Sequence, residues 1–211
     1  MKHVVLLGDS VFDNTAYVSG GPDVVRQLGG ALPEGWQATL RAVDGATTAS
    51  VARQVESLPP GASHLVVSVG GNDALGEAGV LEERAGSMAE AVGRLAVIRQ
   101  RFSENYASML DHVAATGLPT AVCTIYEARF DDPFRQLLTS AGLTIFNDAI
   151  VRQAFSRGLP LLDLRLIFSA AEDYANPIEP SVRGGAKLAA AISSAVTEHD
   201  FSRRRSEVFV S

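Results

Sequence analysis

Five short apolar runs, separated by longer amphipathic stretches, constrain the fold of this chain more than any other feature. They lie at residues 3–7, 38–43, 64–69, 119–125 and 159–164. Each is rich in β-branched residues or leucine and ends in a polar or glycine-containing turn, which is typical of buried parallel strands. The stretches between them show helical spacing, and the longest runs from Ser87 to Thr116. The alternation predicts an α/β fold, a three-layer α/β/α sandwich with a central five-stranded parallel sheet of the flavodoxin-like type.

The chain is long enough for one domain of this kind. It has 211 residues, of which 46% are hydrophobic, so a core can form between sheet and helices. We expect a single domain over residues 1–200 and a polar, solvated tail over residues 201–211. Residues 127–142 mix charged and apolar side chains without clear periodicity, and we interpret them as a loop that could act as a lid before a helix over 143–156.

Charge, cysteine content and the apolar runs exclude several classes of function. A net charge of −6 leaves no basic surface for a nucleic acid. The single cysteine, Cys123, excludes an intramolecular disulfide. The N-terminal apolar run is shorter than a signal core and no stretch reaches membrane-spanning length, so we expect a cytoplasmic protein without membrane insertion. No cluster has metal-ligand spacing, and we expect neither a metal nor an organic cofactor.

Polar and glycine residues follow the first three apolar runs. The segments are Gly8-Asp9-Ser10, Asp44-Gly45-Ala46 and Gly70-Gly71-Asn72-Asp73. Ligands bind outside the carboxyl ends of parallel strands, so these segments meet at the edge where a site is expected. A hydroxyl, a glycine amide and an asparagine amide are what is needed to attack a carbonyl and hold the resulting oxyanion. Each segment alone is also explained as a turn or helix cap, but the ordered set favours a catalytic site.

These ordered segments resemble the SGNH hydrolases, also called GDSL esterases and lipases, over nearly the whole chain, from Val4 to about Ala190. The resemblance implies that Ser10 is the nucleophile. It also implies an oxyanion hole built from the amide of Ser10, the amide of Gly45 and the side chain of Asn72. Asp9 is implied to hold the turn of the nucleophile, and Asp73 to brace its neighbouring asparagine.

The family's last block departs from its usual pattern here. It normally reads Asp-x-x-His, whereas this chain has "DYANPIEPSVRGGAKLA". One register places Glu179 at the histidine position and Asn176 at the aspartate position. A second register keeps Asp173 as the aspartate, with Asn176 in place of histidine. Both registers lack the usual base, and none of the four histidines of the chain lies where it would replace it.

We therefore hypothesise that Glu179 accepts the proton of Ser10 and is oriented by a hydrogen bond from Asn176. A carboxylate is about two pKa units less basic than histidine, and burial narrows that gap. The alternative is that Glu179 is a carboxylate bonded to backbone amides at the start of the last helix. Tyr126 and Arg129 follow the fourth strand and could select the acyl or anionic group of a substrate. Arg129 is equally explained as the partner of one of the aspartates just after it.

The sequence thus predicts a serine hydrolase that acts on a small carboxylic ester through an acyl-enzyme, and it leaves the oligomeric state open. Two alternatives stay open at this point. The protein could be a binding protein that keeps the fold and has lost turnover with the histidine. It could also be an acyltransferase, in which a hydroxyl of a second ligand replaces water.

Overall fold

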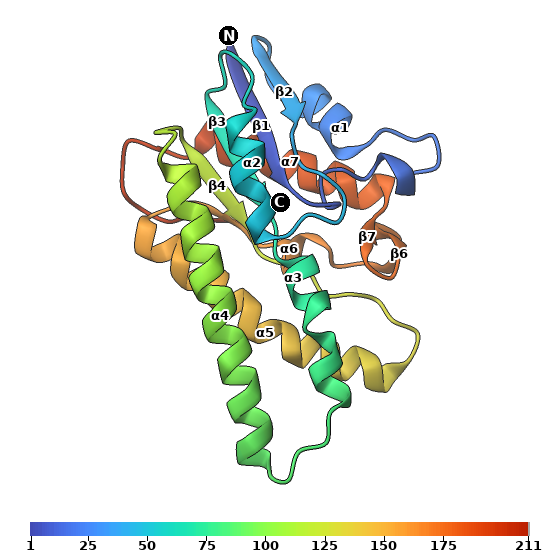
Figure 1. Cartoon of the computed structure of the whole chain (residues 1–211). Helices are drawn as coiled ribbons and strands as arrows, with labels where there is room; N and C mark the ends of the chain where they lie inside the picture. Colours follow the sequence, from blue (N-terminus) through green and yellow to red (C-terminus); the bar gives the residue numbers. More distant parts are fainter. Residues whose placement is uncertain (211) are drawn as a thin grey trace.

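A parallel sheet between two layers of helices forms the body of the molecule in the computed structural model, which describes residues 1–210 (Figure 1). The strand order is β2-β1-β3-β4-β5-β8, and all neighbouring pairs are parallel. The strands are β1 (Lys2–Gly8), β2 (Trp36–Leu40), β3 (His64–Ser68), β4 (Thr120–Cys123), β5 (Leu161–Leu162) and β8 (Val208–Phe209). The predicted three-layer α/β/α sandwich is confirmed.

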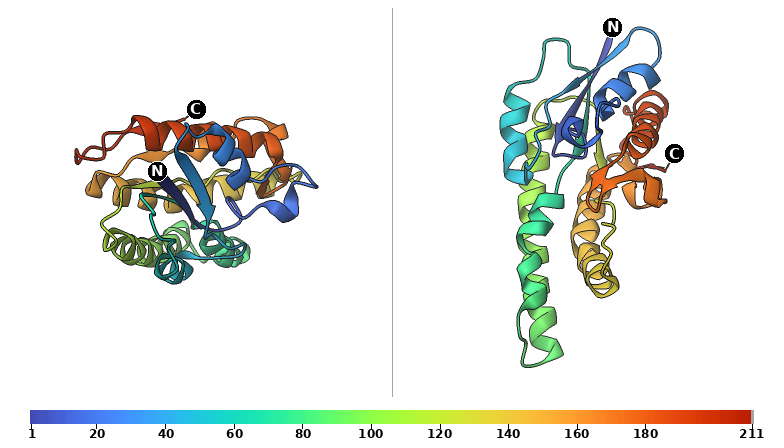
Figure 2. Two further views of the ribbon diagram at one scale, coloured as in Figure 1. Left: turned by 90° about the horizontal axis from the view of Figure 1, so that it is seen from above. Right: turned by 90° about the vertical axis from the view of Figure 1, so that its right-hand side faces the viewer.

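The helices divide between the two faces of the sheet, as the end-on views of Figure 2 show for α1 and α7 against α2 and α4. One face is covered by α1 (Val24–Ala31), α6 (Leu164–Ile167) and α7 (Val182–Glu198). The other is covered by α2 (Val51–Glu56), α4 (Met88–Ala114) and α5 (Pro133–Arg157). A short helix α3 (Gly71–Gly76) and four 3-10 helices, η1 (Thr15–Tyr17), η2 (Thr48–Ser50), η3 (Ala78–Glu82) and η4 (Ala171–Asp173), lie in the connections. Within residues 1–210, no helix combines the length and apolar character needed to cross a bilayer.

The C-terminal segment contributes a sixth strand, which the sequence prediction of a solvated tail missed. Strand β8 pairs with β5, and the amide of Leu161 donates to the carbonyl of Glu207 at 2.8 Å. The ring of His199 anchors the same segment through a 2.7 Å hydrogen bond between its Nδ1 and the Glu207 carboxylate. Only two residues pair in this strand, too few to give a periodic signal. The last residue of the predicted tail, Ser211, lies outside the described residues.

Helix α5 begins ten residues earlier than predicted. Asp132 caps it by accepting hydrogen bonds from the amides of Phe134 and Arg135, and Pro133 occupies its first turn. Proline in the first turn loses no helical hydrogen bond, and aspartate before it is a preferred cap. The Asp132-Pro133 pair was therefore the sequence signal from which the start of α5 could have been predicted. The predicted loop over 127–142 shrinks to residues 127–132, and its second half forms a helical wall.

Helix α4 is longer than the sheet it covers. Its 27 residues span about 40 Å, and its first half extends past the sheet beside α3 and η3 (Figure 1). Met88 and Val92 on this half are 80% and 59% exposed, although the helical spacing places them on the same face as the buried residues further along. The overhanging part of α4 and the first half of α5 thus form two arms beyond the carboxyl ends of the strands.

Candidate active site

The turn after β1 presents Ser10 at the edge of the sheet. Gly8 has a φ of +129°, and a Cβ there would come within 1.7 Å of the Ser68 carbonyl oxygen, so only glycine fits. Gln54 holds the same glycine from α2, accepting from its amide at 2.7 Å and donating to its carbonyl at 2.8 Å. Asp9 accepts from the amide of Val11 at 3.2 Å, as expected of a residue that holds this turn.

The Gly45 loop lies against the Ser10 turn. The amide of Val43 donates to the Gly8 carbonyl at 3.0 Å, and the amide of Asp44 donates to Asp13 at 3.0 Å. Gly45 has a φ of +77°, the left-handed conformation that glycine adopts without strain. The amides of Ser10 and Gly45 have no hydrogen-bond acceptor among residues 1–210, whereas the amides on either side of Gly45 are bonded. These two N–H groups are available to a ligand.

Asn72 and Asp73 connect the third strand to the same loop. The Asn72 side chain donates to the Ala46 carbonyl at 2.9 Å, which leaves its second N–H free. Asp73 was expected to brace Asn72, but its carboxylate binds Thr48 instead, with the amide at 3.0 Å and the hydroxyl at 2.7 Å. It therefore holds the residues after Gly45 in place, and acts on the site through that loop.

Glu179 and Ser10 line one cavity, and both are buried, at 6% and 8% exposure. Burial raises the pKa of the Glu179 carboxyl to about 7, a hydrogen bond with the Ser10 hydroxyl lowers it, and the charge of Asp44 adds to the rise. The Oε2 atom of Glu179 is buried without a hydrogen-bond partner among the described residues. Ser181, rather than Glu179, caps α7. The carboxylate is thus not used to cap α7.

The backbone on both sides of Glu179 is anchored by three residues from two other segments. It belongs to a small antiparallel hairpin of β6 (Tyr174–Asn176) and β7 (Glu179–Pro180). The donors are Tyr126 Oη to the Ile178 carbonyl at 2.5 Å, the Arg129 amide to the Pro177 carbonyl at 2.8 Å and Asn14 Nδ2 to the Pro180 carbonyl at 3.4 Å. Asn14 is fully buried, and its Oδ1 also accepts from the Val24 amide at the start of α1 at 3.0 Å. These contacts fix where the carboxylate can lie.

Asn176 does not make the predicted contact with Glu179. Its side chain is exposed, and its Oδ1 accepts a hydrogen bond from the amide of Ile178 at 3.0 Å. This closes the tight turn of the hairpin. The reason is local: an asparagine readily bonds the backbone amide two residues further on.

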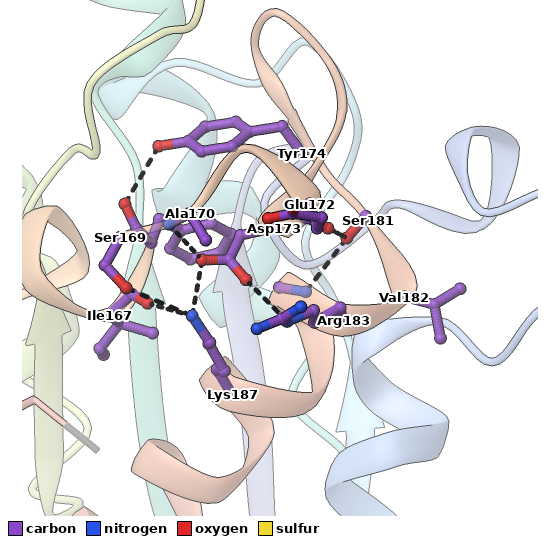
Figure 3. A network of polar contacts seen from close by, with 12 residues as sticks. Ile167, Ser169, Ala170, Glu172, Asp173, Tyr174, Ser181, Val182, Arg183 and Lys187 are labelled. Atoms are coloured by element: carbon purple, nitrogen blue, oxygen red, sulfur yellow. Dashed lines mark hydrogen bonds and ion pairs between the residues drawn. The ribbon is translucent and has the colours of Figure 1, made fainter.

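Asp173 binds basic residues of α7 on the far side of the hairpin (Figure 3). It is fully buried, accepts from Lys187 at 2.6 Å and from the Ala170 amide at 2.9 Å, and lies 3.6 Å from Arg183. Burial raises the pKa of Asp173, but the hydrogen bonds from Lys187 and Ala170 outweigh it and hold the pKa below its usual value. Asp173 does not line the cavity that holds Ser10 and Glu179.

Tyr126 lines the cavity, whereas Arg129 does not. The ring of Tyr126 stacks on Phe168 with centroids 4.6 Å apart. The guanidinium of Arg129 lies over the ring of Tyr174 at 5.5 Å and donates to the Ser169 carbonyl at 3.4 Å, and its role in substrate selection stays a prediction. It also makes no ion pair with the aspartates that follow it.

The cavity has a volume of about 150 Å³ and lies between the two arms seen in the right-hand view of Figure 2. Ser10, Asn72 and Glu179 are at one end of its lining, and most of the remaining lining is apolar. A second, wider opening adjoins it, lined by Tyr17, Arg135 and again Glu179. These walls could not be predicted from the sequence, because the apolar residues of α4 and α5 have the same spacing as ordinary core positions.

No histidine lines the cavity. His3 binds Thr39, His64 binds Ser63, His112 binds the Ser108 carbonyl and His199 binds Glu207. Over residues 1–210, no three His, Cys, Asp or Glu side chains come together in a way that could hold a metal ion. The ionisable groups facing Ser10 are therefore carboxyls.

The parallel sandwich, with a serine after its first strand and free amide donors on the neighbouring loop, defines an SGNH-type hydrolase fold. Residues 6–186 match the GDSL-like Lipase/Acylhydrolase family, and the chain belongs to this family. Its members' chemistry is that of ester hydrolases and acyltransferases acting on small-molecule esters. No curated protein sequence matches the chain.

Solved structures with the same fold include three lipolytic enzymes. These are the extracellular lipase of Streptomyces rimosus (19% identity, TM-score 0.60, covering 92% of this chain and 100% of that one), phospholipase A1 of Streptomyces albidoflavus NA297 (18%, 0.63, 92% and 98%) and the lipase Lip_vut3 from a goat rumen metagenome (18%, 0.68, 92% and 97%). Identities this low establish the shared fold, which extends over nearly the whole chain.

Proposed function

We propose that this protein is a serine ester hydrolase in which Glu179 takes the part of the absent histidine. The observation that carries the proposal is that Ser10 and Glu179 line one cavity, where burial raises the pKa of the Glu179 carboxyl to about 7 against the lowering effect of the Ser10 hydroxyl. A general base works best when its pKa lies near the operating pH, and burial brings this carboxylate into that range. Asp9, the other carboxyl beside Ser10, is less suited because its pKa is raised to about 8 by burial and it already accepts from the Val11 amide.

The reaction would use the free N–H groups around Ser10 as an oxyanion hole. The amides of Ser10 and Gly45 have no acceptor in the described chain, and Asn72 has one N–H unused. Donors that are already oriented and not bonded elsewhere stabilise a developing oxyanion without reorganisation. The proposal therefore assigns each of them to the substrate's carbonyl oxygen.

The proposed reaction transfers the acyl group of the ester first to Ser10 and then to water. Ser10 Oγ attacks the ester carbonyl while Glu179 takes its proton, and the carbonyl oxygen becomes the oxyanion. The bond from carbon to the alcohol oxygen then breaks, and Glu179 returns the proton to the leaving alcohol. Water repeats the attack on the acyl-enzyme, with Glu179 again accepting and returning a proton, and releases a carboxylic acid and free Ser10.

A fluorophosphonate probe tests this assignment, because it labels a serine that a working base activates. Wild type should label, Ser10→Ala should not, and Glu179→Gln should label 10²- to 10⁴-fold more slowly, the range for removal of a general base. Glu56→Gln is the matched control, since Glu56 is an exposed glutamate of α2 that does not line the cavity. It should label at the wild-type rate.

Three outcomes would contradict the proposal. Absence of labelling in folded wild type would favour the binding-protein alternative. Equal labelling of wild type and Ser10→Ala would remove the nucleophile. Equal rates in wild type and Glu179→Gln would require another base.

The cytoplasmic location remains a prediction from the sequence.

A further inference from the structure

The inner walls of the cavity beyond Ser10 are hydrocarbon. They come from α3 and η3, from α4 and from α5, and include Leu75, Val80, Leu95, Ile98, Leu143 and Phe146. The free energy falls when an apolar group replaces water against surfaces of this kind. The cavity is continuous with the catalytic residues, because Ser10 and Asn72 belong to the same lining. Whatever occupies it is therefore attached to, or part of, the reacting group.

Charge in the cavity lining excludes an ionised occupant. No lysine or arginine lines it, so an anionic chain would find no partner. Of its three carboxyls, Glu77 is paired with Arg101, the pKa of about 8 keeps Asp9 protonated at neutral pH, and Glu179 is the proposed base, which is also shared with the wider opening. Burying an unpaired charge against hydrocarbon is strongly unfavourable. The occupant is an uncharged apolar group.

The position of Glu179 decides which half of an ester enters the cavity. Glu179 is shared between the apolar cavity and the wider opening lined by Tyr17 and Arg135. The leaving alcohol must lie beside Glu179 to receive its proton, and the wider opening offers it space and a route to solvent. The acyl group then extends the other way, between the arms formed by α4 and α5.

From this geometry we propose that the cavity is an acyl pocket that selects esters of apolar fatty acids about six carbons long. This rests on the proposed function and adds the substrate class to it. The length follows from the volume of about 150 Å³, since an apolar cavity of that size in another protein holds one benzene, a six-carbon molecule. The additional carbons of longer chains would project from the pocket and contribute less binding free energy.

The first experiment measures kcat/KM for p-nitrophenyl esters from acetate to decanoate. Each added methylene should raise kcat/KM about fourfold, the effect of burying one CH₂, up to about six carbons, with no further rise beyond. A parallel series of alkyl acetates should show no such dependence on the alcohol. A flat acyl series, or a rise along the alcohol series instead, would overturn the proposal.

The second experiment fills the pocket from Gly142. This glycine lines the cavity on α5, and a Cβ added there meets nothing within 4 Å, so a side chain can enter without a backbone clash. Gly142→Phe should lower the ratio of kcat/KM for hexanoate over acetate at least tenfold. Gly93→Phe is the matched control, because Gly93 is also helical and unobstructed but is exposed and outside the cavity. Equal ratios in the two variants would contradict the pocket assignment.

Binding to Ser10→Ala separates this inference from the proposed function. If no ester is hydrolysed, the proposed function fails. Titration of Ser10→Ala with ethyl acetate and ethyl hexanoate, followed by calorimetry, still tests the pocket. Tighter binding of the hexanoate, weakened by adding Gly142→Phe, would support it, and equal binding of both esters would overturn it.

Discussion

The hydroxyl of Tyr126 donates a 2.5 Å hydrogen bond to the carbonyl oxygen of Ile178, the residue immediately before Glu179. Tyr126 follows β4, whereas Ile178 belongs to the hairpin before α7, so this bond connects the sheet edge to the proposed base. Its ring is held in turn by stacking on Phe168. The contact sets the position of the Glu179 carboxylate without touching the reacting atoms.

Tyr126→Phe should therefore lower kcat about tenfold, because a small displacement of a catalytic group is costly, with little change in KM. The acid limb of its pH profile should also shift, since the surroundings of Glu179 change. Tyr106→Phe is the matched control, because Tyr106 is equally buried but its hydroxyl has no hydrogen-bond partner. Steady-state kinetics from pH 5 to 9 measures both, and indistinguishable profiles for the two variants would argue against a positioning role.

Activity should depend on pH through Glu179. The carboxyl must be deprotonated to accept the serine proton, and its pKa is raised to about 7. The expected kcat/KM falls about tenfold per pH unit below about 7 and levels off above it, because this parameter reports the free enzyme. A plateau that continues down to pH 5 would show that a more acidic group is the base.

Asp9→Asn should change how stability depends on pH. Burial raises the pKa of Asp9 to about 8, far above its value in an unfolded chain. Between about pH 4 and pH 8 the folded state keeps a proton that the unfolded state has lost, so this group makes the protein less stable as pH rises. The asparagine variant lacks this effect. The free energy of unfolding of the variant, minus that of wild type, should therefore increase from pH 5 to pH 8.5 in urea titrations. A difference that does not change with pH would contradict the raised pKa.

Gly184→Ala should destabilise the hairpin that carries Glu179. A Cβ at Gly184 would come within 2.1 Å of the Asp173 carbonyl oxygen and 2.7 Å of the Phe168 ring, so backbone must move. We expect a loss of about 1–3 kcal/mol, the usual cost of overpacking, with reduced activity. Gly93→Ala, in an unobstructed part of α4, should gain up to about 1 kcal/mol from helix propensity. Chemical unfolding of both variants measures the contrast, and equal effects would refute the steric argument.

Asp173→Asn should reduce stability but not catalysis. Asp173 is fully buried, whereas its partners Lys187 and Arg183 are 33% and 61% exposed, so the loss should fall below the about 3–5 kcal/mol of a fully buried pair. The pKa of Asp173 is held low, so its stabilising effect is present at neutral pH and is lost as pH falls. Well below the melting temperature, kcat/KM should stay within about threefold of wild type. A loss comparable to that of Glu179→Gln would return Asp173 to the catalytic machinery.

The three segments around Ser10, Gly45 and Asn72 could be located from the sequence because their signals are local. Each follows a buried strand, and parallel strands bring their carboxyl ends to one edge of the sheet. The family assignment followed from the same segments. Helix α5 shows the limit of this reasoning: its apolar pattern was unclear, although the Asp132-Pro133 cap marked its start.

By itself, the sequence determined the layered α/β fold and the order of the polar turns, because alternation of apolar runs and helical spacing is a property of the chain alone. Only the tertiary structure placed Glu179 in one cavity with Ser10, and Asp173 against Lys187. Contacts from Tyr126, Arg129 and Asn14 anchor the hairpin that carries Glu179. Those partners lie tens of residues or more away along the chain. The apolar pocket likewise exists only where helices overhang the sheet, since helical spacing does not distinguish a core face from a cavity wall.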